Sequence, residues 1–464
     1  MKDSLPSGAS RRHFLKTAAA VSALAGVKIP FVHAAEDNTL NVALIGCGGR
    51  GTGAAANALS VTGPPIKLVA MADVFQKRLD TSFKSLQAQH ADRMDVPDDR
   101  KFIGFDGYKH AMDSLKPGDI AIFTTPLAFR WVHFGYAIEK NLNVFMEKPL
   151  IADGPSAKKM YALAEASEKK NLKCGVGLMS RHAKPLQELH KRIEDGEIGD
   201  IILMRGYRMS GPLASAFSEK WPAEPGGPSE LLWQISRFHS FLWASGGCFA
   251  DFYIHHIDHC CWMKNAWPVK AQTVGGRHYR VGPNGPYIDQ NFDSYAVEYT
   301  FPDNTKFLMD GRCMVGAVPY YASYAHGSKG LAVISKNGDC GAPSSTYKGQ
   351  SLDRANQIWQ STDTSNPYQN EWNELVDAIR TNTPYNEVKR GVDASVATAM
   401  GRMAGHTGQE ISWDDMLNCD QAFAPDADKF TMDSPPPVKS DKDGKYPVPE
   451  PGISKKHEYE VKVS

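Results

Sequence analysis

The chain has 464 residues, of which 42% are hydrophobic and 22% charged, as is ordinary for a soluble globular protein of about two domains. Its 52 lysines and arginines equal its 52 aspartates and glutamates, which argues against a protein that binds nucleic acid or a membrane surface. After residue 34 no apolar run is long enough to cross a bilayer. We therefore expect neither a nucleic-acid partner nor membrane insertion of the mature chain.

Residues 1–34 have the three parts of a secretory signal. A basic start precedes a mostly apolar stretch from Phe14 to Phe31 and a small-residue cleavage site after Ala34 or Ala35. Residues 10–16 (SRRHFLK) resemble the twin-arginine consensus, including the three residues after the arginine pair. The alternative is an ordinary amphipathic helix, but no acidic residue occurs from residue 16 to 35. This route carries folded proteins, so we expect a periplasmic or otherwise exported protein that folds before export.

A glycine-rich turn follows the first predicted strand, Leu40–Gly46, and precedes a helix of small residues. Residues 46–51 (GCGGRG) fit the spacing G-x-G-x-x-G. In such a turn the first glycine bends the chain, the second lets the backbone approach a pyrophosphate, and the third lets the helix pack on the strand. The helix N-terminus adds amide hydrogens and the positive end of its dipole. Because strand and helix flank the motif, the following residues are assigned to a dinucleotide cofactor: Gly46, Gly48, Gly49, Arg50 and Gly51.

The second predicted strand, Ile66–Asp73, ends where this fingerprint expects a carboxylate for the adenine ribose. Asp73 would repel a 2′-phosphate, so NAD is expected rather than NADP. The alternative is a solvated aspartate at a strand end. Two further strands, Asp119–Pro126 and Asn143–Pro149, follow helical stretches, and this alternation predicts a parallel, doubly wound sheet that binds ligands at its carboxyl edge. The residues that fall at this edge are Thr124, Thr125, Pro126, Glu147 and Lys148.

Glu147-Lys148-Pro149 directly after an apolar strand is the most specific pattern in the chain. Together with residues 124–150 (TTPLAFRWVHFGYAIEKNLNVFMEKPL), it resembles the Gfo/Idh/MocA oxidoreductases. The resemblance extends over nearly the whole mature chain. It includes a crossing between domains at Gly177–Tyr207, a catalytic helix at Gly246–Trp262, and a closing helix and tail at Pro384–Met416.

The resemblance implies an α/β protein in which an N-terminal Rossmann domain precedes a C-terminal α/β domain with a large open, mainly antiparallel sheet. Residues 294–301 and 306–313 agree, because they flank a turn sequence as a hairpin would. We expect a Rossmann domain at 38–178, a substrate and oligomerisation domain at 179–433, and a Pro- and Lys-rich tail at 434–464 that forms an extended surface strap.

Hydride transfer from a carbinol requires a base for the hydroxyl proton and a group that orients the hydroxyl. Lys148, beside the expected cofactor, can donate to the substrate hydroxyl and to the nicotinamide ribose; the alternative is a surface lysine. Asp251 and His255 are four residues apart, so a helix places both on one face. They match the family's D-x-x-x-H spacing. We assign His255 as the general acid/base and Asp251 as the carboxylate that orients it or binds a second hydroxyl.

Four more residues are candidates for substrate contacts. Tyr253 stands where the family's pattern usually has glycine, and it either contacts substrate or fills the core. Arg181 and His182 could bind sugar hydroxyls or a carboxylate, or form an ordinary surface pair. Asp258 lies on the same predicted helix, beyond the histidine assigned as acid/base.

The predicted catalytic helix also offers a metal alternative, because Asp251, His255 and His259 share a helical stripe. The chain has no zinc-type pattern of cysteine and histidine spacing. We therefore assign no metal site.

The loop after the third predicted strand and the end of the fourth complete the cofactor assignment. The residues assigned are Thr125, Pro126, Trp131, His133, Glu147 and Lys148. Only Ala35–Thr39 precede the first strand of the mature chain, so tight binding of NAD must depend on the pocket itself. Trp131 is expected to cover part of the dinucleotide.

The expected function is that of an exported NAD-dependent oxidoreductase acting on a hydroxyl of a sugar, polyol or sugar derivative, as a homo-oligomer (a dimer or tetramer). One alternative is an NAD-dependent glycoside hydrolase that works by transient oxidation and elimination, but relatives of that kind depart from Glu-Lys-Pro at the lysine. The other is a non-catalytic sugar-binding protein, which would not need the intact glycines and Asp73.

Overall fold

Six apolar segments in the first half of the chain form one parallel sheet, in the order β3-β2-β1-β4-β5-β6. Its strands are β1 (Leu40–Ile45), β2 (Ile66–Asp73), β3 (Lys101–Ile103), β4 (Ile120–Phe123), β5 (Asn143–Met146) and β6 (Cys174–Val176). The central strands are buried on both faces, as their continuous apolar sequences require. The helices connecting them are α2 (Gly49–Leu59), α3 (Gln76–His90), α4 (Gly107–Asp113), α5 (Arg130–Glu139) and α6 (Gly154–Lys169). The predicted doubly wound parallel sheet is confirmed.

The structure is a computed structural model that describes residues 38–460 apart from 225, 279–280, 283 and 337–342. The predicted signal peptide, residues 1–34, lies outside the described residues. From Thr39 onward the described residues belong to one compact unit. No helix in this described part has both the length and the apolar character that crossing a membrane would require.

The second half of the chain builds a nine-stranded sheet in the order β16-β15-β14-β13-β7-β12-β11-β8-β17. These strands are β7 (Ile201–Ser210), β8 (Lys270–Gly276), β11 (Ser294–Thr300), β12 (Lys306–Cys313), β13 (Tyr320–Gly327), β14 (Gly330–Lys336), β15 (Ser345–Lys348), β16 (Gln357–Gln360) and β17 (Ile411–Ser412). All neighbours pair antiparallel except β12 and β7. The large, mainly antiparallel sheet is confirmed, as is the hairpin of β11 and β12.

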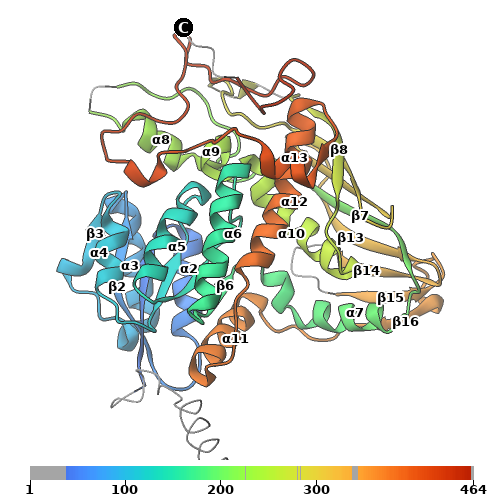
Figure 1. Cartoon of the computed structure of the whole chain (residues 1–464), viewed down its shortest axis with the longest axis horizontal. Coiled ribbons are helices and arrows are strands. Elements are labelled where there is room, and N and C mark those ends of the chain that lie inside the picture. The colour runs from blue at the N-terminus through green and yellow to red at the C-terminus, as the bar shows by residue number, and fades with distance from the viewer. Residues whose placement is uncertain (1–37, 225, 279–280, 283, 337–342, 461–464) are drawn as a thin grey trace, which may run out of the picture. The chain divides into compact units, whose positions relative to one another are not determined.

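Helices α10 (Gly247–Lys264) and α12 (Val388–Thr407) lie between the two sheets and pack against each other (Figure 1). On β12 every second residue is buried, because only one face of the sheet is covered. The other helices of this half are α7 (Lys184–Glu194), α8 (Glu230–Ser236), α9 (Leu242–Ser245), α11 (Pro367–Thr381) and α13 (Trp413–Asn418). A short hairpin joins β9 (Val281–Gly282) and β10 (Gly285–Pro286). Single 3₁₀ turns occur at Ala91–Arg93, Asp98–Arg100, Leu127–Phe129, Met179–His182, Phe238–Ser240, Arg354–Asn356 and Ala427–Lys429.

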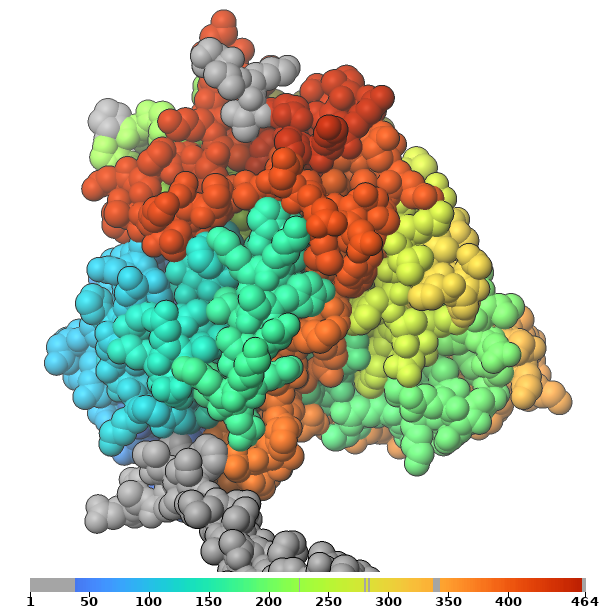
Figure 2. Space-filling model, in the orientation of Figure 1, coloured from blue at the N-terminus to red at the C-terminus, as the bar shows by residue number. Residues whose placement is uncertain are grey.

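The tail after residue 433 is extended, and some of its side chains reach into the interior. It crosses the outside of the molecule after α13, where Figure 2 shows it in red, yet several of its side chains are buried. The buried side chains include Val438, Tyr446, Glu458 and Tyr459.

Glu458 accounts for this anchoring, because its carboxylate forms ion pairs inside the molecule. Both of its oxygens accept from the guanidinium of Arg402 on α12, at 2.7 and 2.8 Å, and Nδ1 of His406 lies 2.7 Å from one of them. Arg402 also donates to the carbonyl oxygens of Ala152 and Gly246, at 2.6 and 3.1 Å. The tail is therefore tied to the segments that follow Lys148 and that begin α10.

Candidate functional site

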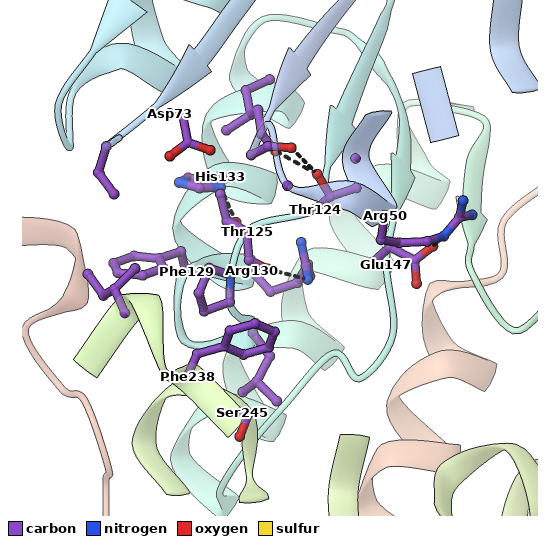
Figure 3. A pocket seen from close by; sticks show the side chains of 18 of the residues that line it. Arg50, Asp73, Thr124, Thr125, Phe129, Arg130, His133, Glu147, Phe238 and Ser245 are labelled. Carbon is purple, nitrogen blue, oxygen red and sulfur yellow. Dashed lines mark hydrogen bonds and ion pairs between the residues drawn. The ribbon is translucent and has the colours of Figure 1, made fainter. Parts of the chain in front are cut away.

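A cavity of about 350 Å³ lies at the carboxyl ends of β1, β2, β4 and β5, where a doubly wound sheet binds its ligands. Residues of the 3₁₀ turn Phe238–Ser240 and of α10 form its other wall. Figure 3 shows Asp73 near the end of β2, Thr124 and Thr125 below it, and Phe238 and Ser245 on the opposite wall. The cavity therefore joins the glycine-rich turn to residues more than a hundred positions later.

The glycine-rich turn has the close contacts that its sequence predicts. Gly46 has a φ of +97°, and a Cβ there would lie 2.7 Å from the amide nitrogen of Thr125. At Gly51 a Cβ would lie 2.0 Å from the carbonyl oxygen of Gly46, so only glycine lets α2 pack this closely on β1. By contrast, a Cβ at Gly48 or Gly49 would meet no atom within 4 Å. The turn thus leaves open backbone at the N-terminus of α2, which fits the phosphates of a dinucleotide.

Asp73 lines the cavity and is fixed by the turn. Its carboxylate accepts from the amide of Cys47 at 2.7 Å and from the amide of Phe75 at 2.9 Å. Burial raises the pKa of the Asp73 carboxyl, although these amides and the charge of Arg78 oppose the shift. Arg78 also lines the cavity, with its guanidinium 4.6 Å from the Phe75 ring. The sequence analysis did not single out Arg78; its position one turn into the helix after Asp73 is the signal that could have identified it.

Arg50 and Glu147 line the cavity, but their side chains pair with each other. Nε of Arg50 lies 2.5 Å from Glu147, and its NH2 group lies 3.1 Å from Glu371 on α11. Figure 3 shows the Arg50 side chain extending toward Glu147 at one end of the site. Burial and the charge of Glu147 raise the pKa of Glu371. These two side chains line the cavity as assigned from the sequence, and their ion pairs also hold the turn against α11.

Thr125, Pro126 and His133 line the cavity as assigned from the sequence. The Thr125 hydroxyl lies 3.2 Å from Nδ1 of His133, and burial with the neighbouring Arg130 lowers the pKa of His133 to about 3, so this ring is neutral. Trp131 does not line the cavity; its ring lies 3.4 Å from Nζ of Lys159 on α6. The prediction that Trp131 covers the dinucleotide is wrong, because the turns of α5 point its side chain at α6.

Lys148 and Asp251 meet in the cavity, although 103 positions separate them. Nζ of Lys148 donates to the backbone carbonyl of Asp251 at 2.8 Å and lies 3.5 Å from its Oδ1. Burial alone would raise the pKa of Asp251, but Lys148 and His239 hold it well below its usual range. The structure thus brings together an ammonium and a carboxylate that stays ionised.

His239 is a site residue that the sequence analysis missed. It lines the cavity from the 3₁₀ turn, with Nε2 3.1 Å from Oδ2 of Asp251 and Nδ1 2.9 Å from the hydroxyl of Ser215. Its ring stacks on Phe252 with a centroid separation of 5.2 Å. The local sequence, residues 236–242 (SRFHSFL), matches no motif, and only the packing of this turn on α10 places the ring beside Asp251.

His255 lies one turn beyond Asp251 on α10 and is 6% exposed. Its charge contributes to the low pKa of Asp251, but it is not among the residues that line the cavity. Tyr253 is buried against Phe249, and a Cβ at Gly311 would lie 2.0 Å from its ring. Of the two roles left open for Tyr253, the structure gives it the core.

Arg181, His182 and Asp258 lie outside the cavity, which corrects their assignment to substrate. Arg181 donates to both oxygens of Asp258, and Asp258 is completely buried. Burial would lower the pKa of His182, but hydrogen bonds to Glu374 and Glu387 raise it to about 9. These charged side chains pair with one another at the place where α10, α11 and the segment before α7 meet.

The known proteins that are similar to this chain in sequence are named as dehydrogenases. No family model matches the chain. The scyllo-inositol 2-dehydrogenase (NAD(+)) of Bacillus subtilis is 28% identical over 178 residues, 38% of this chain and 43% of that enzyme. The levoglucosan dehydrogenase of Pseudarthrobacter phenanthrenivorans is 31% identical over 122 residues, 26% of this chain and 27% of that enzyme. The matched stretch thus spans less than half the length of each of these relatives.

Solved structures match over more of the chain. The aldose-aldose oxidoreductase from Caulobacter crescentus, complexed with glycerol, aligns with a TM-score of 0.60 at 15% identity, covering 81% of this chain and 99% of that one. The scyllo-inositol dehydrogenase from Lactobacillus casei, with bound NAD(H) and scyllo-inositol, aligns with a TM-score of 0.57 at 19% identity, covering 81% and 99%. The chain therefore has the fold of these oxidoreductases.

Proposed function

We propose that the protein is an NAD-dependent oxidoreductase that transfers a hydride between the nicotinamide and a hydroxyl of a sugar, polyol or sugar derivative. The observation that carries the proposal is the single cavity that joins the glycine-rich turn and Asp73 to the Lys148–Asp251 pair. The named activities of the relatives, on inositols, levoglucosan and aldoses, support the substrate class.

The residues present fit a bound dinucleotide. The open backbone at Gly48 and Gly49 would receive the phosphates, and Asp73 the adenine ribose. A bound NAD supplies a nicotinamide that accepts the hydride. The chain itself orients the substrate: the Lys148 ammonium donates to the hydroxyl oxygen, and the Asp251 carboxylate accepts from a neighbouring hydroxyl. The assignment of His255 as general acid/base remains a prediction from its spacing to Asp251.

Asp73→Ser is expected to raise the affinity for NADP relative to NAD, because it removes the carboxylate that would repel a 2′-phosphate. It also replaces the two carboxylate oxygens that accept from the Cys47 and Phe75 amides by a single hydroxyl, so the affinity for NAD itself is expected to fall. Binding of both cofactors is measured by calorimetry, with the exposed Asp92→Ser as control. An unmutated protein that prefers NADP would contradict the assignment of Asp73.

We further propose that the chain is exported by the twin-arginine route with NAD already bound, as a dimer or tetramer. An exported enzyme has no supply of free NAD, and this route carries folded proteins. The sheet face away from α10 and α12 carries apolar side chains such as Val274, which is 80% exposed, and this face would join the subunits.

Protein purified after export is expected to release NAD when it is denatured, as detected by mass spectrometry. The native protein is then screened with inositols, aldoses and anhydrosugars, and reduction of its bound NAD is followed by absorbance. Reduction by one of these classes supports the proposal, whereas cofactor-free protein that binds NAD only weakly would contradict preloading. Release of sugar from a glycoside without net reduction would instead support the hydrolase.

A further inference from the structure

Arg130 is a charged side chain of the cavity wall to which the proposed reaction gives no role (Figure 3). It is the first residue of α5, it lines the cavity, and it is 1% exposed. Its guanidinium donates to the backbone carbonyl oxygens of Phe123, at 2.9 Å, and Thr125, at 3.0 Å. Its Nε is buried without a hydrogen-bond partner, and the guanidinium forms no ion pair with a carboxylate of the described residues. The cavity wall therefore contains a buried positive charge without a paired negative one.

The neighbouring charges are already paired with each other. Nζ of Lys148 lies 3.5 Å from Oδ1 of Asp251, and Nε of Arg50 lies 2.5 Å from Glu147. Burial lowers the pKa of Arg130 to about 10, while the charges of Glu147 and Asp251 oppose the shift, so the guanidinium stays protonated at neutral pH. Because these two carboxylates act on it, Arg130 belongs to the end of the cavity where Lys148 and Asp251 meet.

The place of this charge at the start of a helix makes it unfavourable for stability. The N-terminus of a helix is the positive end of its dipole, where acidic side chains are stabilising and basic ones are not. The first turn of α5 contains no acidic residue that would offset the guanidinium. A buried charge without a partner also costs free energy. Features that break a local rule in this way occur at functional sites, so the charge is expected to serve a ligand of the cavity.

The nicotinamide is the part of NAD whose own charge changes in the reaction. The glycine-rich turn and Asp73 would hold the phosphates and the adenine ribose, so the nicotinamide would lie at the other end of the cavity, with Lys148 and Asp251. The oxidised ring has a positive charge, and the ring becomes neutral when it gains a hydride, which is two electrons and one proton. A fixed positive charge nearby repels the oxidised ring and leaves the reduced ring unaffected.

We propose that Arg130 raises the reduction potential of NAD bound in this cavity, because its unpaired positive charge disfavours the oxidised nicotinamide. This inference rests on the proposed oxidoreductase function. With the potential raised, the loaded protein takes a hydride from a carbinol more readily and returns it to a carbonyl less readily. Arg130 thus sets the balance between the two directions of the reaction without contacting the reacting atoms.

The test is a redox titration of the full mature protein with its bound NAD. Dithionite supplies the electrons through mediator dyes, and the absorbance of the reduced nicotinamide gives the midpoint potential. The wild type is expected to lie at least about 30 mV above free NAD, which corresponds to tenfold tighter binding of NADH than of NAD⁺. Arg130→Gln is expected to lose on the order of tenfold of this preference. A wild-type potential equal to or below that of free NAD would overturn the proposal.

Two further variants separate the charge from the contacts of the side chain. Arg130→Lys keeps the positive charge but not the two-pronged guanidinium, and it is expected to keep the wild-type potential. Arg354→Gln, at an exposed position, is the surface control and is also expected to leave the potential unchanged. A role in holding the phosphates or the end of β4 would weaken NAD⁺ and NADH equally. An unchanged potential in Arg130→Gln would therefore overturn the proposal.

If Arg130→Gln does not fold, the wild-type potential and that of Arg130→Lys still decide, because a fall of the potential in Arg130→Lys would contradict a role of the charge alone. A protein that binds neither NAD⁺ nor NADH would refute the proposed function and this inference together. A protein with the expected potentials that oxidises none of the sugars and polyols would refute the proposed substrate class and leave the role of Arg130 standing.

Discussion

Replacing Lys148 by alanine is expected to lower turnover by on the order of 10²–10⁴-fold while the affinity for NAD stays nearly unchanged. The ammonium lies in the part of the cavity formed with α10, and its partners are the carbonyl and carboxylate of Asp251. The glycine-rich turn and Asp73, which would hold the phosphates and the adenine ribose, do not depend on it. Steady-state kinetics and calorimetry with NAD give the two quantities.

The control for this variant is Lys169→Ala, because that lysine lies at the end of α6 with 79% of its side chain exposed. It is expected to keep wild-type turnover. If Lys148→Ala is also close to the wild type, Lys148 has no part in the reaction. If it loses NAD binding to the same extent as turnover, its role is to hold the cofactor rather than the substrate hydroxyl.

Glu458→Gln is expected to lower the free energy of unfolding by about 3–5 kcal/mol, the usual cost of removing one partner of a buried ion pair. Arg402 is completely buried, and its guanidinium would lose the only carboxylate that pairs with it among the described residues. The amide keeps one acceptor oxygen, so its NH2 group would face either the Arg402 guanidinium or Nδ1 of His406, whose Nε2 already faces the Tyr295 hydroxyl at 2.8 Å. Urea unfolding followed by fluorescence measures the difference.

The same variant should change how stability depends on acid. Burial would raise the pKa of Glu458, but Arg402 and His406 lower it to about 2. A carboxyl with a depressed pKa in the folded state contributes stability that is present above its unfolded pKa, about 4.3, and is lost as the pH falls toward 2. The wild type is therefore expected to lose this contribution between about pH 4 and 2, and Glu458→Gln is not. Glu194→Gln, on the exposed face of α7, is the matched control.

Local sequence was sufficient to predict the features of the site that depend on residues close together in the chain. The strand, glycines and helix of residues 40–59 form one continuous piece, and the steric demands at Gly46 and Gly51 arise within it. Asp73 could be identified because it ends a predicted strand. Lys148 could be identified because it follows a predicted strand within the Glu-Lys-Pro motif. The three-residue strands β3 and β6 were missed, since they are too short to show a period.

Tertiary structure alone decided which of the candidate residues meet. Helical spacing put Asp251 and His255 on one face but could not tell which of them faces the cavity, or that Tyr253 points at Gly311. The sequence analysis assigned Arg181 and Asp258 as separate substrate ligands. They are 77 positions apart, so their buried ion pair could not be predicted from the sequence.

His239 and Glu458 show the same limit more strongly. Each is a single charged or titratable residue in a stretch without a motif, and its partner lies on another element, on α10 for His239 and on α12 for Glu458. The sequence by itself determined the parallel sheet with its glycine-rich turn, the second sheet and the Lys148 position, because short-range spacing and hydrophobic pattern specify them. Only the folded chain decided how charges are paired, because ion pairs form between whichever segments the packing of the two sheets brings into contact.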